Sequence, residues 1–223
     1  MNVELLNWDK KENIMHVRAK GCTDSFINII RRFAMDEVPT LAVEDVEFQD
    51  NSSGLYDEIV AHRIGLIPIK TDLSSYRLPK NPEEVSEKSA SCTLQLTLKS
   101  SKKGTVYAEE AASSDPKCTF AYPKMPIVSL LPKQKLEVTM LAVMGNGKTH
   151  TKWSPGLVYF KKEVSVNTDK VKINEEIPKL CAGLVDSKLK VDIDKLVISP
   201  VKDACLLVLE KAGAVITDTD NYI

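Results

Sequence analysis

The first apolar positions of the chain alternate with polar ones. Residues 3–8 and 14–19 follow this alternation, and a run of charged and polar residues, 9–13, separates them. A period of two is typical of strands, and a short polar run between two such segments favours a turn. The N-terminus is therefore predicted to be a β-hairpin.

The apolar period then changes from two residues to three and four. After Gly21 the pattern predicts a helix that Thr23 or Asp24 can cap and that is closed off by Pro39. On periodicity alone, an apolar stripe of this kind is typical of a helix that faces a protein core. The stripe is formed by Phe26, Ile29, Ile30 and Phe33.

A polar turn followed by a short helix is predicted over residues 50–69. Asn and Ser beside Gly54 favour a turn, and apolar residues then recur at roughly helical spacing until Pro68 stops them. These apolar residues are Ile59, Val60, Ile64, Leu66 and Ile67. The same stretch carries acidic, basic, hydroxyl and imidazole side chains.

The middle of the chain predicts mostly strands. Residues 70–90 contain prolines, serines and mixed charge, which is typical of an exposed connection. Alternation then predicts strands over 92–98, 105–109 and 136–143, the last one before a Gly-Asn-Gly turn at 145–147.

The pattern of the C-terminal third predicts two similar halves, each with the order strand, helix, strand. This order is typical of a ferredoxin-like unit. The predicted elements are strand 171–173, helix 175–184, strand 188–193, strand 195–198, helix 201–211 and strand 214–217.

Composition and charge argue against nonspecific nucleic-acid binding and against a membrane protein. The chain has 223 residues, of which 43% are hydrophobic, enough for a substantial core, and its formal charge is −1. It lacks the overall positive field that nonspecific nucleic-acid binding needs, so we expect contact with DNA only indirectly. No leader pattern and no apolar run of membrane-spanning length is found, which leads us to expect a cytoplasmic protein without a membrane partner.

A hydrolytic enzyme is one alternative, because His62 lies near Ser52, Asp57 and Glu58 in the sequence. The Gly-x-Ser-x-Gly turn of such enzymes is absent, and these residues belong to one loop and helix instead of converging from separate elements. We therefore predict that the chain has no catalytic residues of its own.

Two stretches carry a family resemblance. Residues 50–69, Asp-Asn-Ser-Ser-Gly-Leu-Tyr-Asp-Glu-Ile-Val-Ala-His-Arg-Ile-Gly-Leu-Ile-Pro-Ile, resemble the signature of the alpha-like subunits of cellular RNA polymerases. In this family the chain is most similar to the archaeal subunits of the D type and to the third-largest subunit of eukaryotic polymerase II. Residues 150–155, His-Thr-Lys-Trp-Ser-Pro, resemble the family's His-Ala-Lys-Trp-Ser-Pro loop.

The resemblance implies a subunit that acts as an assembly platform of DNA-directed RNA polymerase in transcription. Such a subunit forms a heterodimer with a smaller alpha-like subunit of the L type. It also docks the second-largest and largest polymerase subunits and contacts small zinc-binding ones.

The resemblance also assigns roles to residues. It places the apolar stripe in the dimer interface and implies that Arg31 and Arg32 contact the second-largest subunit. In the family this helix is followed by a turn, here Val38-Pro39-Thr40, and by an acidic strand, here with Glu44 and Glu47. Lys152 and Trp153 are predicted to anchor an interface, although a buried Trp corner with a solvated Lys152 is an equal alternative. Partner contacts and loop-shaping hydrogen bonds are predicted for Asp50, Asn51, Ser52, Ser53, Asp57, Glu58, His62 and Arg63.

The predicted fold class is α+β. It comprises an alpha-like dimerisation domain (1–45 and 215–223), an inserted mostly-β domain (46–167) and a degenerate ferredoxin-like domain (168–214). The family continues with a further strand and a long helix, so we expect this chain to lack part of the dimerisation domain.

The five cysteines have no regular spacing, which favours reduced thiols over a disulfide framework. Cys22 is expected to be buried and inert. Eukaryotic relatives carry zinc near Cys92 and Cys118, but two isolated thiols with no nearby His until His150 cannot supply four ligands.

Many archaeal members of the family carry a ferredoxin-like insertion here, some with iron-sulfur clusters, so an iron-sulfur redox protein is the alternative function. This segment has only Cys181 and Cys205, whereas a cluster needs four thiolates. We expect both to be small buried residues on helices, and no cofactor.

Overall fold

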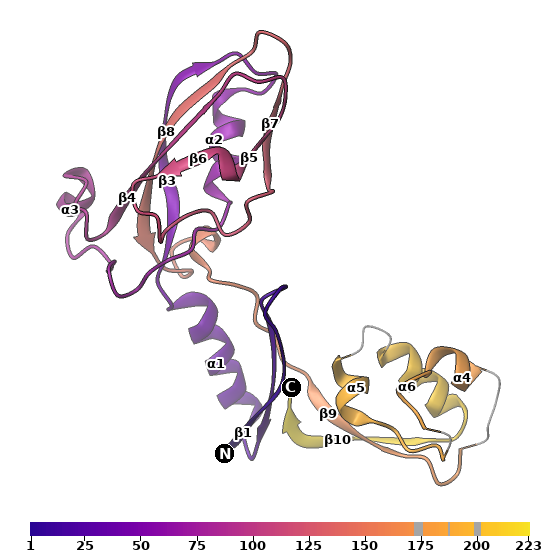
Figure 1. Ribbon diagram of the computed structural model, residues 1–223. Helices are drawn as coiled ribbons and strands as arrows, with labels where there is room; N and C mark the ends of the chain where they lie inside the picture. Colours follow the sequence, from indigo (N-terminus) through magenta and orange to yellow (C-terminus); the bar gives the residue numbers. More distant parts are fainter. Residues whose placement is uncertain (172–175, 187, 199–201) are drawn as a thin grey trace. The chain divides into compact units, whose positions relative to one another are not determined.

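The computed structural model describes residues 1–223 except 172–175, 187 and 199–201. The chain divides into two compact units (Figure 1). The first unit comprises Met1–Arg31 and Tyr159–Ile223, and the second unit comprises Arg32–Val158. No helix of the described residues is long and apolar enough to cross a membrane.

The first unit is built on a four-stranded antiparallel sheet with the order β1-β2-β10-β9. The predicted N-terminal hairpin is confirmed, with Trp8 opposite Met15 near the turn. The predicted last strand is present but extends further, as far as Tyr222. The strands are β1 (Asn2–Asp9), β2 (Ile14–Lys20), β9 (Lys162–Asn167) and β10 (Val215–Tyr222).

Among the described residues between β9 and β10, three short helices share an apolar core of their own. They are α4 (Glu176–Leu180), α5 (Ile193–Ile198) and α6 (Lys202–Lys211). We call residues 168–214 the helical module. Its buried residues are Ile177, Cys181, Leu184, Leu196, Cys205, Val208, Leu209, Ala212 and Ala214.

Several predictions for this module are wrong. Residues 195–198 form part of α5 instead of a strand, because the Asp192 carboxylate accepts a hydrogen bond from the Lys195 backbone N–H (3.3 Å) and so caps a helix. Residues 188–192 contain only an isolated bridge from Val191 to Val185, and Ile193 begins α5. The helix predicted over 175–184 ends at Leu180, before Gly183 with its positive φ of 79°.

Other predictions for the module have mixed outcomes. The helix predicted over 201–211 is confirmed from Lys202 onward. Most of the strand predicted over 171–173 lies outside the described residues. The ferredoxin-like order is not confirmed, since α5 replaces one of its strands.

The second unit joins a four-stranded antiparallel sheet, with the order β3-β8-β4-β6, to the two-stranded sheet β5-β7. The strands are β3 (Thr40–Asn51), β4 (Thr93–Ser100), β5 (Gly104–Tyr107), β6 (Ala111–Ser113), β7 (Pro126–Leu130) and β8 (Leu136–Gly145). The helices are α2 (Asp57–Gly65) and α3 (Pro82–Ser86), with 3-10 turns η1 (Ala108–Glu110) and η2 (Thr151–Trp153).

The core of the second unit lies between the sheets and α2, which buries Val60 and Ile64 completely. Inward residues alternate along β4, with Leu94, Leu96 and Leu98 all nearly inaccessible. This alternation is why the mostly-β prediction for this region holds.

The predictions for this region need three corrections. The connection over 70–90 contains the short helix α3, and the strand predicted over 105–109 ends at Tyr107, directly before η1. β6 and β7 were not predicted, because β6 is only three residues long and β7 begins with a proline.

The cysteines also differ from the predictions. Cys181 and Cys205 are buried as expected, but only Cys205 lies on a helix, because α4 ends before Cys181. The two are joined by a disulfide, with their Cα atoms 5.4 Å apart. Cys22 is partly exposed instead of buried, whereas Cys92 and Cys118 are fully buried.

Candidate partner-docking surface

Helix α1 (Asp24–Asp36) begins with a capped first turn. The Thr23 hydroxyl accepts a hydrogen bond from the Phe26 backbone N–H at 3.3 Å, which is the predicted cap. The Tyr222 hydroxyl donates to the Asp24 carboxylate, and the Lys162 ammonium lies 3.4 Å from it. The start of α1 is therefore tied to β10 and β9, and the hydrogen bond to Asp24 raises the pKa of Tyr222 to about 12.

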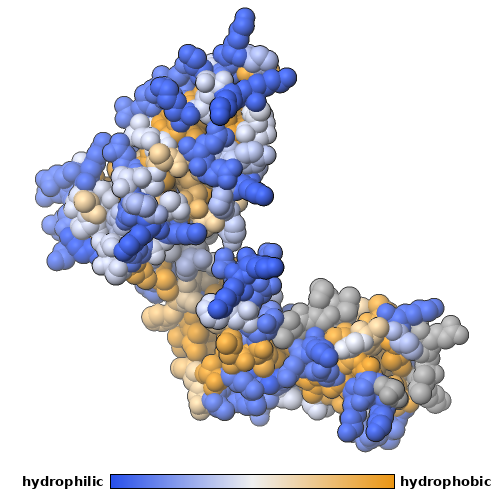
Figure 2. Space-filling view, in the orientation of Figure 1, coloured by the Kyte–Doolittle hydropathy of each residue, from blue (hydrophilic) through white to orange (hydrophobic). Residues whose placement is uncertain are grey.

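The apolar stripe of α1 faces outward. Ile27 is the one buried residue among those of the helix, at 8% exposure. The stripe residues Phe26, Ile29, Ile30 and Phe33 are 43%, 51%, 42% and 61% exposed. The core-facing expectation therefore fails for this stripe, and Figure 2 shows hydrophobic surface over this part of the chain. A contiguous exposed apolar surface is typical of a protein interaction site.

Both arginines beside the stripe contact polar residues of their own helix. The Arg31 guanidinium donates to the Asn28 side-chain oxygen at 3.1 and 3.0 Å. Arg32 Nε lies 3.8 Å from the Asp36 carboxylate, and its side chain is 67% exposed. An exposed pair at this distance is weak, so Arg32 can exchange it for a partner's carboxylate.

The β1–β2 hairpin carries a second exposed apolar surface, which the sequence reasoning missed. Alternation predicted the strands correctly but could not tell whether their apolar face is covered. In the structure this face is open, and its large side chains are about half exposed. They are Val3, Leu5, Trp8 and Met15, whereas Ile14 is exposed on the opposite face of the hairpin.

The polar loop before α2 is held by hydrogen bonds among its own side chains. The Asn51 amide donates to the Asp57 carboxylate (2.6 Å) and to the Leu55 carbonyl (3.0 Å), and its oxygen accepts from the Ser53 hydroxyl (2.7 Å). The Ser52 hydroxyl accepts from the Lys135 backbone N–H at 2.7 Å. These residues thus have the predicted loop-shaping bonds, and they hold the loop in one conformation.

Other polar residues of this segment point to solvent. Asp50, Glu58 and His62 are exposed, and the Arg63 guanidinium donates to the Pro126 carbonyl at 3.0 Å. The structure therefore separates the segment into residues that shape the loop and residues that remain available to a partner.

Lys152 and Trp153 both contact residues of their own unit. Trp153 is 8% exposed, and its indole N–H donates to the Val143 carbonyl at 2.9 Å. The Lys152 ammonium lies 4.4 Å from the indole ring centroid, donates to the Val43 carbonyl at 3.1 Å and pairs with Glu44. Trp153 is therefore buried, as the alternative of a buried Trp corner predicts, but Lys152, which that alternative predicts to be solvated, is mostly covered.

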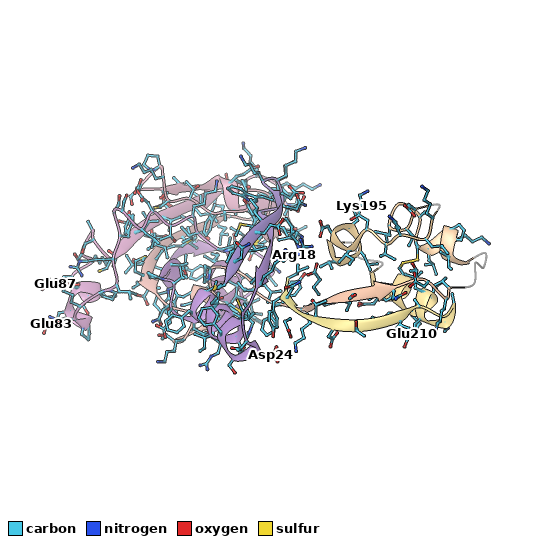
Figure 3. All side chains as sticks on the ribbon, turned by 90° about the horizontal axis from the view of Figure 1, so that it is seen from below. Arg18, Asp24, Glu83, Glu87, Lys195 and Glu210 are labelled. Carbon is cyan, nitrogen blue, oxygen red and sulfur yellow. A yellow bond between two sulfur atoms is a disulfide. The ribbon has the colours of Figure 1, made fainter. Side chains whose placement is uncertain are left out.

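A buried charge cluster in the first unit was also missed by the sequence reasoning. Arg18 on β2 and Glu163 on β9 are 8% and 6% exposed, and Arg18 Nη2 lies 2.7 Å from the Glu163 carboxylate. Arg18 also pairs with Asp194 of α5 and with Glu4 of β1. Figure 3 labels Arg18, which ties the helical module to the sheet through Asp194.

The described part of the chain contains no group of three or more His, Cys, Asp or Glu residues placed to hold a metal ion. Burial raises the pKa of the Cys92 and Cys118 thiols. Both thiols are therefore protonated and weakly nucleophilic near neutral pH.

Comparison with known proteins relates the chain to a family of RNA polymerase subunits. Residues 46–157 match the family model of the RNA polymerase Rpb3/RpoA insert domain. The chain is 38% identical over 168 residues to the DNA-directed RNA polymerase subunit Rpo3 of Pyrococcus furiosus, covering 75% of this chain and 62% of the relative.

Two further relatives carry the same name. Rpo3 of Methanosphaera stadtmanae is 35% identical, over 91% of this chain and 76% of the relative. Rpo3 of Methanosarcina mazei is 43% identical, over 65% of this chain and 54% of the relative. The chain thus spans less than two thirds of the length of several relatives that it matches.

Proposed function

The chain belongs to the Rpo3 family of DNA-directed RNA polymerase subunits, and we propose that it is a non-catalytic assembly subunit of an archaeal DNA-directed RNA polymerase. The observation that carries this proposal is the outward apolar stripe of α1. Solvent exposure of four large apolar side chains on one helix face is unfavourable unless a partner covers them.

The proposed partner on this stripe is a smaller alpha-like subunit of the L type, bound as a heterodimer. Burying a large apolar side chain contributes about 1.5–3 kcal/mol. The four stripe residues are about half exposed in the free chain, so each gains about half of this value on docking, and the stripe needs further contact area to offset the entropic cost of association. The exposed hairpin residues offer additional apolar area in the same unit.

The proposed contacts with the second-largest and largest subunits are polar. Arg31 and Arg32 flank the stripe, and Asp50, Glu58 and His62 are exposed around α2. The internal hydrogen bonds of the 51–57 loop support this assignment, because a preformed loop loses little entropy when it docks. Contacts with small zinc-binding polymerase subunits are part of the same proposal.

The hydrolytic alternative is disfavoured by what its residues do. Ser52 accepts the Lys135 backbone N–H, and Asp57 accepts the Asn51 amide, so both serve the loop. The redox alternative is unsupported, because Cys181 and Cys205 are bonded to each other and neither thiolate is free to ligate a cluster.

The assembly proposal is tested by affinity purification of the tagged chain from an archaeal cell extract. Mass spectrometry of the recovered proteins is expected to identify a small alpha-like subunit and both large polymerase subunits. Recovery of the tagged chain without any polymerase subunit would refute the proposal. A tagged unrelated protein of similar size serves as the control for adhesion to the resin.

A further inference from the structure

Two turns lie side by side at one end of the second unit. The turn from β4 to β5 starts at Ser100, which is opposite Leu136 of β8, and ends at Gly104, which is opposite Leu130 of β7. The turn from β7 to β8 connects Leu130 and Leu136, which are the strand partners of Gly104 and Ser100. Both turns therefore close the same end of the two sheets, at the Asn51 end of β3 (Figure 1).

This end carries four exposed lysines, which we call the lysine end: Lys102, Lys103, Lys133 and Lys135. Among the ion pairs of the described residues, none involves these four ammonium groups. The neighbouring Lys99 does have a partner, the Glu137 carboxylate at 2.9 Å. Four unpaired charges within two adjacent turns create a positive potential that the chain as a whole, at −1, does not have.

The acidic groups nearest to the lysine end do not neutralise it. Glu137 is paired with Lys99, and Asp57 accepts the Asn51 amide. Asp50 lies opposite Glu137 across the β3–β8 pair, on the sheet and outside both turns. The turns themselves contain no acidic residue over 100–104 and 131–135.

The second turn is held in one shape. The Leu131 backbone N–H donates to the Gln134 side-chain oxygen at 2.7 Å, and the Gln134 N–H donates to the Leu131 carbonyl at 3.1 Å. Lys133 has a positive φ of 71°, and the Lys135 N–H is bonded to the Ser52 hydroxyl. A turn constrained in this way presents its lysines at low entropic cost.

An apolar side chain lies among these charges. Leu131 is 64% exposed, directly after the buried Leu130 and before Pro132. Apolar contact area beside unpaired lysines fits an acidic peptide that carries an apolar residue. Neither turn contains an arginine or an aromatic residue, the side chains on which nucleic-acid bases stack.

We propose that the lysine end is a docking site for an acidic protein segment, with Leu131 receiving an apolar side chain between the acidic residues. The site lies on turns that α1 does not include. A failure of peptide binding at the lysine end can therefore be distinguished from a failure of the assembly proposal, which rests on α1.

The test uses the full chain and a fluorescent synthetic peptide of Glu and Asp residues with a central Leu-Leu pair, followed by fluorescence anisotropy. The peptide is expected to bind, and its affinity is expected to fall with added salt. The double variants Lys102→Glu/Lys103→Glu and Lys133→Glu/Lys135→Glu are each expected to weaken binding by about tenfold or more. Leu131→Ser is expected to weaken it by roughly threefold to tenfold, through lost apolar burial.

The matched control is Lys124→Glu/Lys148→Glu, which makes the same charge change at exposed lysines outside both turns. This control is expected to bind the peptide as the unaltered chain does. The proposal is overturned if the unaltered chain does not bind the peptide, or if the control loses as much affinity as the lysine-end variants. It is also overturned if duplex DNA binds the lysine end more tightly than the peptide.

Discussion

The indole ring of Trp153 occupies the space in which a side chain at Gly145 would lie. A Cβ atom at Gly145 would come within 2.5 Å of two indole carbons. The ring is held there by the hydrogen bond from its N–H to the Val143 carbonyl. The end of β8 and the loop that follows it are thus interlocked, so this family-like loop contributes to the core of the second unit.

Substitution at either position should destabilise the chain for opposite reasons. Gly145→Ala overpacks the site and is expected to cost about 1–3 kcal/mol, whereas Trp153→Ala leaves a cavity and is expected to cost about 3–5 kcal/mol. Because removal of the indole relieves the clash, the double variant should cost clearly less than the sum. Urea unfolding of the four proteins measures these values, and simple additivity would contradict the interlock.

Sequence patterns were sufficient where the signal is local. The turn and helix around α2 were predicted because Gly54, the apolar spacing and Pro68 all lie within one short stretch. The apolar stripe of α1 was also found, but periodicity cannot show whether such a face meets a core or solvent. That distinction depends on which surfaces the rest of the chain covers.

Patterns failed where long-range contacts decide the structure. The β-branched Val197 and Ile198 favour a strand, yet the cap at Asp192 and the burial of Leu196 make this segment a helix. The disulfide joins residues 24 positions apart, and no local spacing indicates it. The Arg18–Glu163 pair joins β2 to β9 and is equally invisible in the linear sequence.

The buried pair in the first unit should be sensitive to loss of one partner. Glu163→Leu leaves Arg18 in a buried position without its buried carboxylate partner, and we expect a loss of about 3 kcal/mol in unfolding free energy. Glu4→Gln removes an acceptor of Arg18 whose side chain is 50% exposed, and it should cost less than about 1 kcal/mol. Denaturant unfolding compares the two, and equal losses would show that burial does not control this pair.

Stability should fall in acid through Glu84. The Arg77 guanidinium, at 2.9 and 3.0 Å, and then the Lys80 backbone N–H lower the pKa of Glu84 from 4.5 to about 2. A carboxylate with a depressed folded-state pKa stabilises the fold above its unfolded pKa and loses this contribution as pH falls. The loss is therefore expected between pH 4.5 and about 2.

The variant Glu84→Gln should flatten this part of the stability profile, measured as the urea midpoint at successive pH values. Glu83→Gln, at the adjacent position of α3 labelled in Figure 3, is the control and should leave the slope unchanged. The assignment would be wrong if Glu84→Gln kept the full acid-dependent loss.

The disulfide should stabilise the helical module. Opening a loop of 24 residues restores chain entropy to the unfolded state, and we expect Cys181→Ser/Cys205→Ser to lose about 3 kcal/mol. Thermal unfolding measures this loss. Adding a reductant to the unaltered chain should lower its melting temperature as much as the double substitution does. The control is Cys22→Ser, which lies outside the disulfide and should leave the melting temperature unchanged. If a reductant did not change the melting temperature of the unaltered chain, the prediction would be contradicted.

The central claim is that the outward stripe of α1 binds a smaller alpha-like subunit. Isothermal titration of the purified chain with an archaeal subunit of the L type tests it most directly, together with Phe33→Glu on the stripe. The control Asn28→Glu adds the same charge about 140° around the helix from Phe33 and keeps an acceptor for Arg31. We predict binding of one partner per chain, weakened by about 2 kcal/mol, or roughly 30-fold, in Phe33→Glu and unchanged in Asn28→Glu. Absence of binding, or equal affinities for the two variants, would contradict the account.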